Sequence, residues 1–242
     1  MGTSAGALSG SLYCAGYAPT EVAAILSRTA PIKRLRPCYS PWAGGMLTLE
    51  AVVEELRGLL PPRFDDLPRP LGVGVAGAAT GQHVLVDSGV LPEAVAASAA
   101  IPLIFSPVQI PGVAGGPFMD GGVHCRIGLE LWRQGRYSGS HAGTTPPAVV
   151  HLISRSSPFS GNDSTQGLQN ATVLHAPKSG KSFFDLGDFE TEFEGARRRA
   201  LPMLRELLER QQEQQLWQQQ QQEQGDWEDE QLFWQPQPTP AP

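Results

Sequence analysis

The strongest constraint on the fold is a glycine-flanked serine motif near the start of the sequence. It matches the pattern G-x-S-x-G and consists of Gly2, Thr3, Ser4, Ala5 and Gly6. Such a serine stands on a sharp, strained turn from a strand into a helix, where only small neighbours leave room for the backbone. The residues that follow, up to Ala15, are rich in Ala, Gly and Ser, which predicts a helix packed closely against a sheet.

Strand and helix patterns alternate along the rest of the chain. Helical spacing of apolar residues predicts helices over residues 20–27, 47–60, 92–100, 123–132 and 190–215. Short apolar runs predict strands over residues 71–79, 82–86, 108–110, 118–119, 148–154 and 171–175. This alternation predicts an α/β fold, here a three-layer sandwich with a largely parallel central sheet.

The composition changes near residue 211. Glutamine-rich runs give way to acidic residues with interspersed tryptophans, and the chain ends in QPQPTPAP. Such a segment has few residues that could form a packed core. We therefore expect one domain over residues 1–210, followed by a Gln/Trp/Pro-rich, disordered tail over residues 211–242.

Charge and cysteine content exclude several classes of protein. The net charge of −6 argues against nucleic acid as a partner. The cysteines Cys14, Cys38 and Cys125 are too widely spaced for a zinc motif, and neither the histidines nor the glycine runs complete a metal or cofactor motif. No secretory signal is visible, and no apolar run approaches the ~20 residues of a membrane span. We expect a cytoplasmic protein, or one peripheral to an intracellular membrane, with no metal or cofactor.

A second candidate site residue is Asp120, which is followed by Gly121 and Gly122. Taken alone, Asp-Gly is a common turn dipeptide. Paired with an upstream nucleophilic serine, the same carboxylate can act as the general base, because the glycines leave it uncrowded. Residues around 97–105 are apolar and are a candidate wall for an acyl pocket.

Three sequence blocks together resemble the patatin-like phospholipase family. They are the serine motif, the segment A-S-A-A-I-P at residues 97–102, and M-D-G-G-V at residues 119–123. The resemblance covers roughly residues 1–210. It implies a lipid acyl hydrolase with a two-residue site and no histidine, in which Ser4 is the nucleophile and Asp120 the proton acceptor. The implied substrate is a lipid ester. Because lipid esters reside in membranes, the resemblance also implies peripheral contact with a membrane surface.

One departure from that family concerns the oxyanion hole. In the family, an N-terminal strand leads into a glycine-rich loop whose amides bind the oxyanion, and this sequence begins after both. We therefore expect an N-terminally incomplete member that lacks the first strand and the oxyanion-loop segment, with the Ala5 amide as a minor donor.

Two alternatives to the two-residue site stay open. The order Ser4, Asp120, His175 would also satisfy a Ser-Asp-His esterase triad. His124 lies too close to Asp120 along the chain to complete such a triad, and the position of His151 within a strand favours a core or edge role. A protein of another class, which keeps the fold to bind lipid or a partner without catalysis, is the second alternative.

Overall fold

The computed structural model describes residues 1–27, 35–38, 44–137, 147–154, 161–177 and 188–233. The chain divides into two compact units, Met1–Glu194 and Gly195–Pro242. The first unit contains the described strands and the candidate site residues, and it is therefore the part that matters for function.

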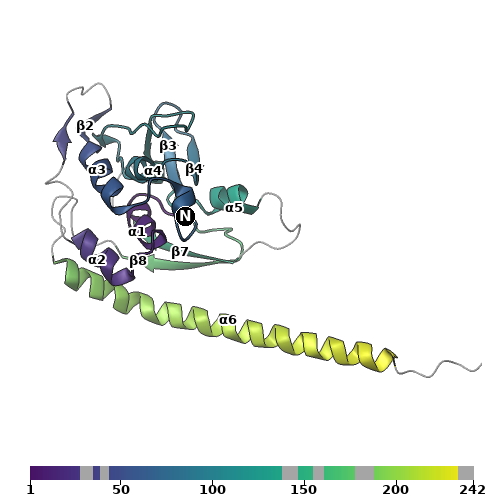
Figure 1. Cartoon of the computed structure of the whole chain (residues 1–242). Helices are drawn as coiled ribbons and strands as arrows, with labels where there is room; N and C mark the ends of the chain where they lie inside the picture. The colour runs from purple at the N-terminus through teal and green to yellow at the C-terminus, as the bar shows by residue number, and fades with distance from the viewer. Residues whose placement is uncertain (28–34, 39–43, 138–146, 155–160, 178–187, 234–242) are drawn as a thin grey trace, which may run out of the picture. The chain divides into compact units, whose positions relative to one another are not determined.

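The sheet nearest the site consists of β3 (Val73–Gly77) flanked by β4 (His83–Val86) and β6 (Phe118–Asp120) (Figure 1). Both neighbours pair with β3 antiparallel. The predicted largely parallel central sheet is therefore not confirmed. β3 and β4 are joined by only five residues, too few for the crossover that a parallel pair requires.

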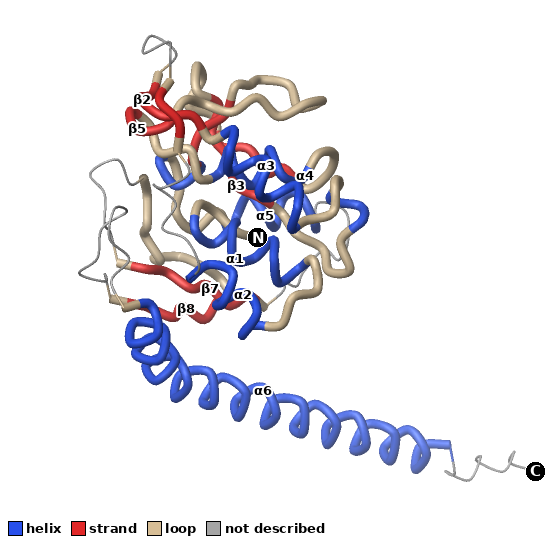
Figure 2. The backbone as a smooth tube through the Cα atoms, turned by 60° about the vertical axis from the view of Figure 1, so that its left-hand side comes forward, coloured by secondary structure: helices blue, strands red, loops and turns tan. Residues whose placement is uncertain are grey.

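Parallel pairing occurs elsewhere in the described chain. β7 (Ala148–Ile153) pairs in parallel with β8 (Ala171–Ala176), and β2 (Gly45–Thr48) pairs in parallel with β5 (Leu103–Phe105). β1 (Arg36–Pro37) completes the second sheet by antiparallel pairing with β2. The strands thus form small sheets within an α/β fold, as the tube in Figure 2 shows.

The described helices correspond to the predicted ones in most places. They are α1 (Ala5–Cys14), α2 (Pro19–Ser27), α3 (Glu50–Leu59), α4 (Leu91–Ser98), α5 (Leu129–Tyr137) and α6 (Phe189–Phe233), with short 3₁₀ turns at η3 (Phe64–Asp66) and η4 (Gly121–Val123). No helix within the described residues combines the length and the apolar character needed to cross a bilayer.

Two helix predictions are wrong in their boundaries. The segment 47–60 first completes strand β2 and becomes helical only at Glu50. The segment 123–132 is interrupted, because Gly128 adopts a positive φ of 61°, so α5 begins only at Leu129. The short strand predicted at residues 108–110 is reduced to a single bridge between Val108 and Phe118.

Helix α6 extends past residue 211, where the sequence predicted a disordered tail. Gln, Glu and Leu all have good helix propensity, so the composition of this segment is compatible with a helix as well as with disorder. The predicted domain boundary near residue 210 stays a prediction.

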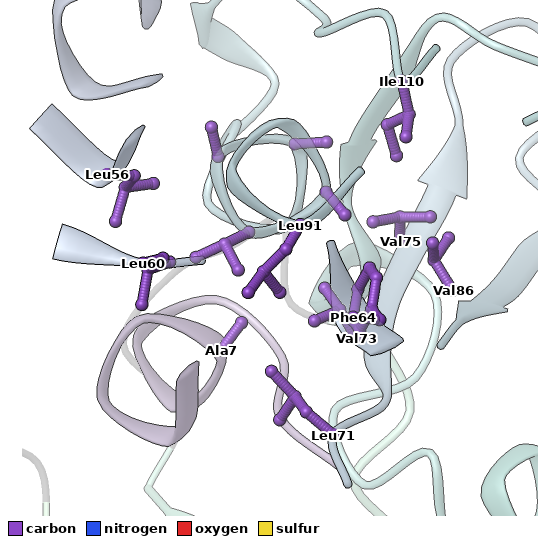
Figure 3. Close-up of a cluster of buried hydrophobic side chains, with 14 of the residues drawn as sticks. Ala7, Leu56, Leu60, Phe64, Leu71, Val73, Val75, Val86, Leu91 and Ile110 are labelled. Carbon is purple, nitrogen blue, oxygen red and sulfur yellow. The ribbon is translucent and has the colours of Figure 1, made fainter. Parts of the chain in front are cut away.

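The core is centred on α4, whose eight residues are all buried. Side chains from α1, α3 and β3 meet those of α4 in one cluster, and Figure 3 shows Leu91 of α4 among Ala7, Leu60 and Val73. Small alanines along α4 let the neighbouring elements approach closely. This packing brings the ends of α4, β3 and β6 to the start of α1, where Ser4 lies.

Candidate active site

Ser4 occupies a strained turn between an extended segment and helix α1. Gly2 donates its N–H to Gly72 O (2.9 Å) and accepts from Gly74 N–H (3.0 Å), so it pairs in parallel with β3. Ser4 then adopts φ 55° and ψ −122°, and α1 begins at the next residue. A positive φ at a non-glycine residue costs ~1–3 kcal/mol and persists only where the surroundings enforce it. The predicted turn with serine at its apex is therefore present.

Three glycines around this turn lie close to other atoms, which are backbone atoms at Gly2 and Gly121 and side-chain atoms at Gly74. A Cβ on Gly2 would lie 2.3 Å from Gly6 O, one on Gly74 would lie 2.7 Å from Thr3 Oγ1, and one on Gly121 would lie 2.6 Å from the Gly74 carbonyl. Gly6 itself faces open space, so its place in the motif has no such steric cause. The sequence favours a close-packed strand over a phosphate loop at Gly72 and Gly74, but it does not predict the close approach of Thr3 to Gly74, which comes from a remote segment.

The topology of β3 brings Ser4 and Asp120 together. Gly2 runs parallel to β3 opposite Val73, while β6 runs antiparallel and ends with Asp120 opposite Val75. The segment at Gly2 and the strand β6 lie along the same edge of β3. Alternate residues of a strand form hydrogen bonds at the same edge, and the bonds to these two segments come from the even-numbered residues Gly72, Gly74 and Ala78. The two segments therefore point toward each other and meet beside Gly74.

Asp120 is a buried carboxylate in contact with the serine. Its side chain lies close enough to the Ser4 side chain to be stabilised by it, and its Oδ1 accepts from the Gly122 amide at 2.8 Å. Burial raises the pKa of Asp120 above its usual value, while the Ser4 side chain, the bond from Gly122 and the charge of Arg126 oppose that shift. Asp120 thus has the geometry of a base for the Ser4 proton.

A cavity of about 630 Å³ opens above these two residues. Its walls combine polar groups with apolar side chains, which include Ile101, Ile127, Trp132 and residues of strand β7. Within the predicted wall at residues 97–105, only Ile101 is among the lining residues, because most of the preceding helix is buried in the core. A partly apolar cavity of this size around polar groups is typical of a small-molecule site.

Arg126 lines the same cavity and was not predicted from sequence. One end of its guanidinium pairs with Asp163 (Nη1 to Oδ2, 3.2 Å), and the other donates to Ile153 O. These anchors hold a positive charge near Asp120. No sequence signal marks this residue, since its partners lie 27 and 37 positions away.

The start of α1 supplies one candidate oxyanion donor. The Gly6 and Ala7 amides donate to Thr3 O and Ser4 O at 2.9 Å each, whereas the Ala5 amide has no acceptor among the hydrogen bonds of the described residues. Ala5 also lines the cavity. Free amides at a helix N-terminus favour negative charge, which fits the predicted role of the Ala5 amide.

The histidine predicted for a triad, His175, does not lie beside Ser4 and Asp120. His175 is exposed on β8 and is not among the residues that line the cavity, so the structure does not bring it to Ser4 and Asp120. His151 of β7 does line the cavity, and the exposed His124 faces His83 with ring centroids 5.6 Å apart. Within the described part of the chain, no group of at least three His, Cys, Asp or Glu side chains could hold a metal ion.

Comparison with known proteins agrees with this geometry. The profile of the family described as Patatin-like phospholipase matches residues 1–130, more than half of the 242-residue chain and a range that includes Ser4 and Asp120. No curated protein matches the sequence. The chain therefore belongs to the patatin-like phospholipase family.

Proposed function

We propose that this protein is a lipid acyl hydrolase that uses a Ser4–Asp120 dyad. The family supports hydrolysis of lipid acyl esters in general. The observation that carries the dyad is the position of the Ser4 side chain beside the buried Asp120 carboxylate, where both residues line one cavity. A nucleophile within reach of its base is the arrangement that acyl transfer requires.

In the first step, Ser4 Oγ attacks the acyl carbonyl of the substrate, and Asp120 takes the hydroxyl proton. The oxyanion of the tetrahedral intermediate is stabilised by the Ala5 amide and by the positive end of the α1 dipole. When the intermediate collapses, the alkoxide leaving group takes the proton back from Asp120. The products are a free alcohol and an ester between the acyl group and Ser4.

In the second step, a water molecule attacks the acyl-enzyme, and Asp120 again accepts a proton. Collapse of this intermediate releases the fatty acid and returns the proton to Ser4 Oγ. The raised pKa of Asp120 makes the carboxylate a stronger base than an exposed aspartate would be. The apolar side chains in the cavity walls fit an acyl chain, and because lipid esters reside in membranes and droplets, the protein is expected to act at a lipid surface.

Labelling with a fluorophosphonate serine probe tests this proposal. Wild-type protein is expected to be labelled, and Ser4→Ala is expected to abolish labelling because the nucleophile is gone. Asp120→Asn should slow labelling by about 10²–10⁴-fold, the usual contribution of a positioned base. The rate constants are measured by mass spectrometry of the intact chain.

The matched control is His175→Ala, which removes an exposed imidazole on β8. Its labelling rate should equal that of the wild type, and a loss comparable to that of Asp120→Asn would favour the Ser-Asp-His triad instead. Lipid binding without turnover, unchanged in Ser4→Ala, would point to the non-catalytic alternative.

A further inference from the structure

A second serine, Ser98, is completely buried at the end of α4 and contacts the turn that carries Ser4. Its Oγ accepts the Ser4 backbone N–H at 2.9 Å and donates to Gly74 O at 2.7 Å. The direction of both bonds is fixed, because an amide can only donate and a carbonyl can only accept. A hydroxyl is one of the few groups that can serve both partners.

The Ser4 amide depends on this contact. Ser4 precedes the first residue of α1, so its N–H has no partner within the helix, and the Ser98 hydroxyl is the acceptor that it bonds to. Leaving a part-buried amide without an acceptor costs free energy, and here that cost would fall on a turn that is already strained.

Gly74 connects the two sides of the turn. Its N–H donates to Gly2 O at 3.0 Å, two residues before Ser4, and its carbonyl accepts from Ser98, which holds Ser4 itself. Strand β3 thereby fixes the chain before the turn directly and the turn itself through the Ser98 hydroxyl.

The same short segment also holds Asp120. The Asp120 N–H donates to Ala100 O at 3.0 Å, two residues after Ser98. Residues 98 to 100 thus contact the backbones of both Ser4 and Asp120, which are 116 positions apart in the sequence. A displacement of this segment would change the distance between the two side chains.

We propose that Ser98 is a positioning residue that holds the Ser4 backbone in its strained conformation and so keeps the nucleophile within reach of Asp120. This inference rests on the proposed role of Ser4 as nucleophile. Ser98 does not itself contact the reacting atoms. Its loss should slow the chemical step while leaving the walls of the cavity, and hence substrate binding, unchanged.

The test compares Ser98→Ala with Ser11→Ala. Ser11 is an equally buried helical serine, in α1, and its Oγ donates to Leu8 O at 2.9 Å without contacting the site. Misplacement of a reacting group by a fraction of an ångström to one ångström is worth about 10- to 100-fold in rate. Ser98→Ala is expected to lower the probe-labelling rate and the kcat for a short-chain nitrophenyl ester by that factor, with KM unchanged.

Ser11→Ala controls for loss of a buried hydroxyl as such. It should lower the melting temperature much as Ser98→Ala does, yet label at the wild-type rate. Equal labelling by wild type and folded Ser98→Ala would overturn the proposal. If Ser98→Ala does not melt cooperatively, Ser98→Cys takes its place. The thiol is of similar size to the hydroxyl but is a weak hydrogen-bonding group, so kcat should fall by less than the factor expected for Ser98→Ala.

Amide hydrogen exchange separates this inference from the dyad. The Ser4 amide is expected to be protected in wild type and in Ser11→Ala, and to exchange faster in Ser98→Ala. If wild-type protein does not react with the probe, the dyad proposal fails, but faster exchange would still support the Ser98 contact. Unchanged protection of the Ser4 amide in Ser98→Ala would contradict it in either case.

Discussion

At the scale of single residues, the proposed mechanism depends on a carboxylate that is buried and must nevertheless ionise to act as a base. Asp120 is 6% exposed, and burial raises its pKa. The Ser4 hydroxyl, the Gly122 amide and the positive charge of Arg126 all favour the ionised form. Arg126 is the only one of these that carries a full charge, so it should have a measurable effect on the pH range of activity.

Replacing Arg126 tests this electrostatic effect. In Arg126→Gln, the pKa of Asp120 should rise further, because a charge that favours the carboxylate is lost. Activity is lost as pH falls through the pKa of the base, so the acid limb of the kcat/KM profile should move to higher pH. Arg126→Lys keeps the charge and should stay closer to wild type. An acid limb that does not move in Arg126→Gln would show that Arg126 has no such influence.

At the scale of secondary-structure elements, the start of β4 packs against the segment that follows η4 through two histidine rings. His83 and His124 have centroids 5.6 Å apart, and His83 Nε2 is buried without a hydrogen-bond partner in the described structure. Burial, and then the nearby His124, lower the pKa of His83 from 6.5. The contact between these segments therefore favours a neutral His83.

This packing makes a prediction about stability and pH. The unfolded chain takes up a proton at His83 near its ordinary pKa of 6.5, whereas the folded chain does so only at lower pH. The contribution of a neutral His83 to the free energy of unfolding is thus fully present above pH 6.5. It is lost progressively as the pH falls below that value. His83→Gln should make the decline in melting temperature between about pH 7 and pH 5 shallower. The exposed His175→Ala is the control, and an equal decline in His83→Gln and wild type would contradict the prediction.

At the scale of the whole molecule, the candidate site belongs to a single compact unit. Ser4, Ser98, Asp120 and Arg126, together with all residues that line the cavity, fall within Met1–Glu194. The core around α4 also lies within this unit. A compact unit with its own core is expected to fold independently of the rest of the chain.

A shortened chain that ends at Glu194 tests that independence. It is expected to melt cooperatively and to react with the fluorophosphonate probe at the rate of the full chain, because no site residue is removed. Ser4→Ala in the shortened chain is the control for specific labelling. A shortened chain that folds but labels much more slowly would show that residues 195–242 contribute to the site.

Several features could be predicted because neighbouring residues encode them. The serine turn follows from small residues around Ser4, and the Asp120 turn follows from the glycines after it. The three blocks that resemble the patatin-like phospholipases lie in order along the chain, and the family prediction is confirmed. The catalytic roles of Ser4 and Asp120 stay predictions, although the structure places the two side chains in contact.

By itself, the sequence determined the α/β class, the family and the positions of the two candidate residues, since each can be recognised from short local patterns and their order along the chain. Only the tertiary structure decided the antiparallel pairing beside Ser4 and the contacts that Gly74, Ser98 and Arg126 make around the site. The reason is physical: the bond from Ser4 to Ser98 joins residues 94 positions apart, and no local pattern specifies which distant groups will meet.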